Sequence, residues 1–163
     1  MGAGSMGSSK GELDRVLFAE IYPALWRFAS AVCDADLDPD DVVQEAVAQV
    51  LRRQPLSDLE YPSAYLKACI VNLVKNSHRS RSRQRSALQR TRPEAEVVAE
   101  YPSEVAALLF DLGADDRAAL YLVDVERLSH DDAAALLGCS TPALRKRVSR
   151  ARAHVRRHLE AER

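Results

Sequence analysis

Charged side chains gather into blocks of one sign in this sequence. The residues in these blocks are the ones best suited to bind partners of opposite charge. The acidic block, residues 34–45, holds six Asp and Glu residues and no base. Each of two basic blocks, 75–92 and 145–157, holds seven Lys and Arg residues and no acid. A formal net charge of -1 conceals this segregation. The pattern predicts two contacts with a polyanion and one separate surface that attracts a basic partner.

The sequence contains none of the common motifs of enzymes or of cofactor-binding proteins. The sequence has no nucleophile elbow, P-loop, dinucleotide fingerprint or zinc-protease motif, so we expect neither an enzyme nor a cofactor. Acids of the acidic block have the spacing of an EF-hand calcium loop, but Pro39 stands where the sharp turn needs glycine. Because Pro39 fits the first position of a helix better, we expect no metal and interpret the acids as a contact with another protein.

The composition of the 163 residues favours helical, aliphatic cores. Apolar residues make up 47% of the chain and aromatic residues only 6%. No apolar run reaches the roughly 18 residues of a membrane span, so membrane insertion is not expected. Cys33, Cys69 and Cys139 are far apart and lie among apolar residues. This favours core positions in a reducing, cytoplasmic setting over disulfides or a zinc site.

Helical periodicity dominates the first half of the chain. Apolar residues at spacings of three and four predict a helix over 13–32, with a kink or break at Pro23. Asp38 is a suitable N-cap for a second helix that ends near Arg53, and Ser63 can cap a third after a loop. We expect the buried side of the third helix to be aliphatic and its opposite side to be polar and basic.

The composition then changes, which predicts a flexible linker between two small helical domains. Residues 77–92 are polar and basic with almost no apolar anchors, and 93–102 are acidic. We therefore expect an all-α fold, with the segments bounded as follows: a disordered, tag-like tail over 1–12, a first domain over 13–87, the linker over 88–102 and a second domain over 103–163.

The second half has the pattern of a helix-turn-helix. Helices are predicted over 104–112 and 115–127, and a short helix capped by Ser129 ends before Gly138, which suits a left-handed C-cap. A final basic helix, capped by Ser140 or Thr141, follows. Such a helix can enter a DNA major groove while other arginines contact phosphates. A plain helical hairpin with a solvated arginine face is the alternative.

Three motifs, in order, resemble those of the group 4, or extracytoplasmic-function, sigma factors of the sigma-70 family. Residues 38–47, DPDDVVQEAV, are similar to the signature by which sigma region 2 binds polymerase. Residues 65–76, YLKACIVNLVKN, resemble the part of region 2 that binds the −10 promoter element. Residues 128–152 resemble the helix-turn-helix of region 4. The resemblance implies promoter recognition, promoter melting and transcription initiation, with no catalytic residue.

The resemblance also implies a role for individual residues. The residues that would dock on the β′ clamp helices of core RNA polymerase are Asp41, Gln44 and Glu45. The residues that would contact the −10 element are Tyr65, Lys67, Asn72, Lys75, Asn76 and Arg79. The residues that would contact the −35 element are Thr141, Ala143, Arg145, Lys146, Ser149, Arg150 and Arg152.

The implied partners are core polymerase, through the clamp helices and the β flap, promoter DNA, and an anti-sigma factor. Two other functions stay open on the sequence. A stand-alone helix-turn-helix regulator would bind duplex DNA as a dimer without polymerase. A sigma-like decoy would bind an anti-sigma protein and no DNA.

Overall fold

The computed structural model describes residues 5–87, 109 and 111–161, with side chains over 9–80, 109 and 111–161. Within these residues the fold is all-α and contains no strand, which confirms the predicted class. The elements are α1 (Ser5–Val32), α2 (Pro39–Leu51), the 3₁₀ turn η1 (Leu56–Asp58), α3 (Pro62–Ala87), α5 (Ala114–Leu120), the π-helical turn η2 (Tyr121–Val125), α6 (His130–Leu137) and α7 (Thr141–Ala161).

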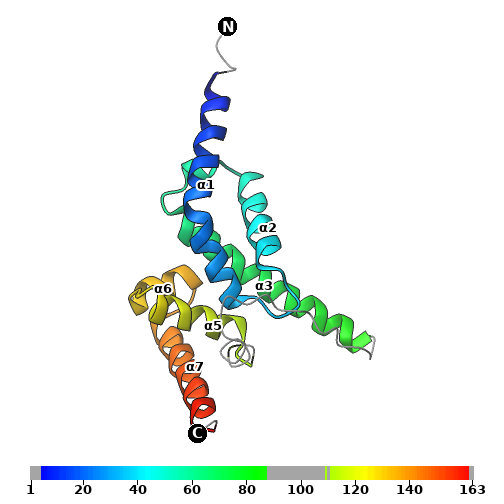
Figure 1. The fold of residues 1–163 in the computed structure, drawn as a ribbon, viewed down its shortest axis with the longest axis vertical. Helices are drawn as coiled ribbons and strands as arrows, with labels where there is room; N and C mark the ends of the chain where they lie inside the picture. The colour runs from blue at the N-terminus through cyan, green and yellow to red at the C-terminus, as the bar shows by residue number, and fades with distance from the viewer. Residues whose placement is uncertain (1–4, 88–108, 110, 162–163) are drawn as a thin grey trace.

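Helices α1, α2 and α3 form an N-terminal half (Figure 1), and their apolar faces meet in a core that continues into residues 118–148. Phe28 of α1, Val43 of α2, and Leu66 and Ile70 of α3 are completely buried there. These residues belong to stripes spaced by three and four, so each helix turns one apolar face inward. The shared core therefore fixes the positions of α2 and α3 relative to α1.

The start of α2 follows the predicted capping pattern. The carboxylate of Asp38 accepts a hydrogen bond from the backbone N–H of Asp40 at 2.8 Å, and Pro39 occupies the first helical position. Asp40 and Asp41 lie in the first turn, where negative charge complements the helix dipole. The acidic block is thus a helix start.

Helix α1 begins at Ser5, earlier than the helix predicted over 13–32, and so includes residues that the sequence assigns to the tail over 1–12. Lys10 pairs with Asp58 at 2.8 Å, and the carboxylate of Asp14 accepts a hydrogen bond from the backbone N–H of Ser57 at 2.9 Å. These partners lie more than forty positions away in sequence, so the helical pattern of α1 alone does not reveal them.

Pro23 does not end α1, which contradicts a break at this position. A proline inside a helix removes one backbone hydrogen bond and strains the preceding turn. The residues that follow compensate, because Leu25, Phe28 and Ala29 are all fully buried in the core. Tertiary packing thus outweighs the local penalty.

Helix α3 begins at Pro62, so Ser63 lies in its first turn and is not its cap. The helix continues to Ala87 and its C-terminal part projects from the rest of the molecule (Figure 1). The predicted linker over 88–102 lies outside the described residues, and so does most of the helix predicted over 104–112.

Helices α5, α6 and α7 form a C-terminal half with the helix-turn-helix arrangement. The hydroxyl of Ser129 accepts a hydrogen bond from the backbone N–H of Asp132 at 3.1 Å, as the capping pattern predicts. Gly138 has φ 62° and ψ 38°, which confirms the left-handed C-cap. Ser140 caps α7 by accepting from the backbone N–H of Ala143 at 3.3 Å. The helix predicted over 115–127 is interrupted, because α5 passes into the π-helical turn η2 after Leu120.

The two halves pack against each other, an arrangement that the sequence does not predict. Tyr121 of η2 lies edge-on to Phe28 of α1, with ring centroids 5.5 Å apart. Arg117 of α5 is only 2% exposed and donates hydrogen bonds to the backbone oxygen of Val32 at 2.6 and 3.1 Å. It also donates to the carboxylate of Asp34 at 2.6 Å. A buried cation therefore joins the C-terminal half to the end of α1.

Candidate polymerase and DNA interfaces

The acidic face of α2 is exposed to solvent. Asp41, Gln44 and Glu45 are all exposed and lie on one side of the helix, opposite the buried valines. Glu45 accepts hydrogen bonds from Gln49 at 2.9 Å and from Arg52 at 3.2 Å, and these bonds lower the pKa of its carboxyl. The Glu45 carboxylate therefore stays charged at neutral pH and can pair with a basic group.

An exposed aromatic pair marks the start of α3. Tyr65, one of the predicted −10 residues, is 43% exposed, and Tyr61, one turn earlier, is 69% exposed. Their rings offer faces on which an unpaired base can stack. The predicted −10 residues do not include Tyr61. Its spacing of four from Tyr65 was the available signal.

The remaining predicted −10 residues divide between exposed and paired positions. Asn72, Asn76 and Arg79 are exposed on α3. Lys75 is half-buried and its ammonium lies 3.1 Å from the carboxylate of Asp115. This part of α3 faces both solvent and the C-terminal half.

Lys67 does not lie on an exposed face as predicted. It is only 7% exposed, and its ammonium lies 2.5 and 2.6 Å from the two carboxylate oxygens of Glu126. The same ammonium lies 5.8 Å from the centre of the Phe28 ring. The C-terminal half covers this side of α3, and no pattern within α3 itself could reveal that covering.

Helix α7 presents the predicted −35 residues along one basic face. Arg145, Lys146 and Ser149 are exposed, and neither of the two cations pairs with a described acid. Arg150 pairs with Asp116 at 2.9 Å. The N-terminal part of the face thus carries exposed cations that pair with none of the described acids.

Other predicted −35 residues are positioned by side chains of the same half. Arg152 forms a two-pronged pair with Asp124 at 2.5 and 3.1 Å, which lowers the pKa of that carboxyl. Thr141 donates its hydroxyl hydrogen to Asp131 at 2.6 Å, and Ala143 is half-buried. These contacts hold the turn of the helix-turn-helix and fix α7 against η2.

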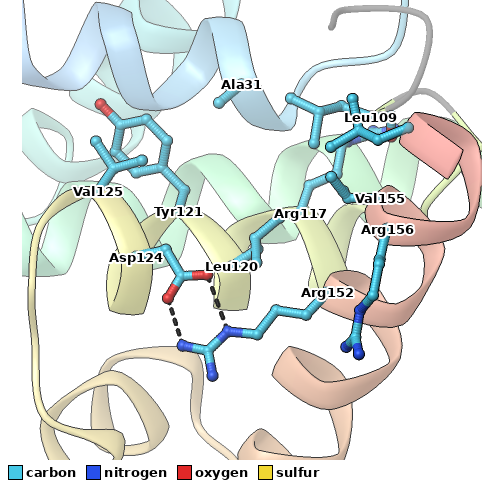
Figure 2. A pocket seen from close by; sticks show the side chains of 11 residues that line it. Ala31, Leu109, Arg117, Leu120, Tyr121, Asp124, Val125, Arg152, Val155 and Arg156 are labelled. Carbon is cyan, nitrogen blue, oxygen red and sulfur yellow. Dashed lines mark hydrogen bonds and ion pairs between the residues drawn. The ribbon is translucent and has the colours of Figure 1, made fainter. Parts of the chain in front are cut away.

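An apolar pocket of about 420 Å³ lies where the end of α1 meets the C-terminal half. Figure 2 shows Ala31 of α1 above Tyr121 and Val125 of η2, with Val155 of α7 on the other side. The Asp124–Arg152 pair closes one edge of the pocket (Figure 2). The pocket belongs to the seam between the halves.

One cysteine and one cluster of side chains could be mistaken for a reactive site and a metal site. Cys33 is buried and burial raises the pKa of its thiol to about 12, so it is a core residue as predicted. Asp111, His154 and His158 bring one ligand atom each within 4.8 Å of one another. The carboxylate of Asp111 is exposed, and it lies 3.8 Å from Nε2 of His158. This geometry suits a solvent-screened ion pair when the imidazole is protonated.

Comparison with known proteins defines the class that this arrangement belongs to. Residues 17–84 match the family model of sigma-70 region 2, and residues 104–155 match that of sigma-70 region 4. The exposed acidic helix and the exposed basic helix therefore lie in the two parts of a sigma-70-type factor.

Individual relatives narrow the class. The chain is 31% identical over 140 residues to the ECF RNA polymerase sigma factor EcfG of Rhodopseudomonas palustris, covering 80% of this chain and 76% of that protein. It is 30% identical over 136 residues to the ECF RNA polymerase sigma factor SigC of Mycobacterium tuberculosis, covering 78% and 73%.

A solved structure is similar along nearly the whole chain. It is the sigma factor RpoE of Bartonella quintana in complex with the anti-sigma factor NepR, with a TM-score of 0.73 and 25% identity. The match covers 91% of this chain and 98% of that one.

The chain belongs to the extracytoplasmic-function sigma factors. It is an RNA polymerase sigma factor that acts in promoter recognition, which is a regulatory role and not a catalytic one. This family membership favours the sigma function over a stand-alone helix-turn-helix regulator. None of the helices in the described parts of the chain is long and apolar enough to cross a membrane.

Proposed function

We propose that three separate surfaces of this sigma factor divide the work of initiation. The acidic face of α2 docks on the β′ clamp helices of core polymerase, and the exposed end of α7 contacts the −35 element. The −10 element is contacted by residues on α3 and directly before it, which are Tyr61, Tyr65, Asn72, Asn76 and Arg79. The observation that carries the proposal is the separation of an exposed acidic helix from an exposed basic helix on one small molecule.

The chain is organised as two domains joined by a linker, and it has partners besides DNA. The first domain spans 13–87 and the second 103–163, with the linker between them passing near the RNA exit path and the second domain resting on the β flap. An anti-sigma factor holds the protein inactive, as the complex of the similar RpoE structure supports. The protein acts in the cytoplasm, because DNA and RNA polymerase are located there.

The polymerase contact is tested by charge reversal. Glu45→Lys should abolish co-elution with bacterial core RNA polymerase in gel filtration, while the matched reversal Glu20→Lys, on the exposed side of α1, should not. Circular dichroism of both variants checks the fold. Equal co-elution of the two variants would contradict docking through α2.

The −35 contact is tested by run-off transcription on promoter templates with and without the −35 element. Arg145→Ala should lower output only where the element is present, by about the 1–3 kcal/mol of one base or phosphate contact. Arg27→Ala, which removes an exposed cation from α1, is the matched control. The same loss on both templates would refute the assignment of α7.

A further inference from the structure

The segment 115–126 carries four acids, and each of them pairs with a base that the sequence predicts to contact DNA. The segment comprises α5 without its first residue, then η2 and the residue that follows. Its acids are Asp115, Asp116, Asp124 and Glu126. Their partners are Lys67 and Lys75 of α3 and Arg147, Arg150 and Arg152 of α7. One short stretch thus engages both helices that would contact the promoter.

Two of these pairs cross between the halves. Glu126 holds Lys67 at 2.5 Å, with only 8% of the lysine side chain and 22% of the glutamate side chain exposed. Asp115 holds Lys75 at 3.1 Å. Because Lys67 is covered, a DNA phosphate cannot reach it while the halves stay together.

The other pairs occupy α7. Asp115 lies 3.6 Å from Arg147 as well as 3.1 Å from Lys75, so one carboxylate lies between two cations from different halves. Asp116 and Asp124 hold Arg150 and Arg152. A phosphate that binds either arginine must compete with a carboxylate already in place.

The distance between the two promoter elements does not allow Lys75 and Arg147 to share the carboxylate of Asp115 while both contact DNA. Elements centred near −10 and −35 are roughly 25 base pairs apart, which is about 85 Å along a straight duplex at 3.4 Å per pair. In this structure Lys75 and Arg147 lie within a few ångströms of the same carboxylate group. Simultaneous contact with both elements therefore requires the halves to separate.

We propose that the segment 115–126 is an intramolecular DNA mimic whose carboxylates occupy phosphate positions and hold the free protein closed. This inference rests on the proposed DNA-binding roles of α3 and α7. The closed form lowers the apparent affinity for DNA by the fraction of molecules that are open. Opening exposes Lys67 and Lys75 together, and it leaves Arg147 as the remaining partner of Asp115.

The test neutralises the two acids that cross between the halves. Asp115→Asn combined with Glu126→Gln keeps size and shape but removes both charges. The matched control is Glu12→Gln combined with Glu160→Gln, because both residues are exposed and neither pairs with a described base. Small-angle X-ray scattering of the free protein reports opening, and fluorescence anisotropy with a labelled random-sequence duplex of about 30 base pairs reports DNA affinity.

The double variant should show a larger radius of gyration and at least about a tenfold gain in affinity over the control pair. An unchanged radius, or a larger radius with no gain in affinity beyond the control, would overturn the proposal. If the double variant loses its helical circular dichroism signal, Asp115→Asn alone leaves the buried Lys67–Glu126 pair in place and should give a gain of about threefold. No gain would again overturn it.

Failure of the mimic and failure of the sigma assignments are separable. Run-off transcription by the unaltered protein with core polymerase tests the promoter assignments and does not depend on the closed form. If the unaltered protein supports transcription but the double variant does not open, only the DNA-mimic proposal is refuted.

Discussion

Buried cations in this protein are held by more than charge. Arg117 donates to the backbone oxygens of Val32 at 2.6 Å and Leu112 at 2.8 Å as well as to the carboxylate of Asp34. A desolvated guanidinium is tolerated only where such partners replace water. The planar fork of arginine suits several acceptors at once, whereas a lysine ammonium is a single point of charge.

Arg117→Lys should therefore destabilise the protein although it keeps the charge. We expect a loss of about 2–3 kcal/mol, since several buried acceptors lose their donor. That corresponds to a melting temperature lower by roughly 5–10 °C. The exposed Arg27→Lys change on α1 is the control and should leave the melting temperature unchanged. Identical melting of the two variants would show that the geometry at Arg117 is unimportant.

Cysteine reactivity should follow burial. Burial raises the pKa of Cys33 to about 12, so at pH 8 its thiol stays protonated and is a poor nucleophile. Cys69 and Cys139 are only half-buried. In timed iodoacetamide labelling of the native protein at pH 8, mass spectrometry should find Cys33 modified last, with all three modified equally once urea unfolds the chain. Early modification of Cys33 would mean that the α1 end opens readily.

At the scale of single elements, three caps were predictable because their partners are local. The caps at Asp38, Ser129 and Gly138 each involve residues within a few positions, so the sequence contains the whole interaction. Two of the misplaced features depend on distant residues. Pro23 is tolerated because of the core around it, and the early start of α1 accompanies contacts with η1.

The turn of the helix-turn-helix offers a direct test of an element boundary. Gly138→Ala places a Cβ at φ 62°, a region that costs an L-residue roughly 1–2 kcal/mol. No atom crowds this site, so strain in the backbone is the whole effect. Gly113→Ala is the matched control, because Gly113 has φ −64° and is equally uncrowded. Thermal unfolding should show a loss at Gly138 and little change at Gly113, and equal shifts would contradict the left-handed cap.

At the scale of the whole molecule, the segregated charges find their partners across the halves. The sequence shows which blocks are basic and which are acidic, and it correctly predicts the exposure of Glu45 and Arg145 from helical periodicity. It cannot show that Glu126 covers Lys67, because these residues are 59 positions apart. Sequence reasoning thus finds faces that meet solvent and misses faces that meet another part of the chain.

The shared packing of the halves predicts cooperative unfolding. Tyr121 packs on Phe28 across the seam and both side chains are buried, so neither half can unfold without exposing the other. Calorimetric and van't Hoff enthalpies of the unaltered protein should agree, as for a single transition.

Tyr121→Ala should remove about 3 kcal/mol of buried aromatic packing and split the transition in two. Tyr61→Ala removes the same atoms from an exposed position on the N-terminal half and should leave one transition. A single, unshifted transition in Tyr121→Ala would show that the Tyr121–Phe28 contact does not hold the halves together, and would leave that role to the Arg117 hydrogen bonds and the ion pairs across the seam.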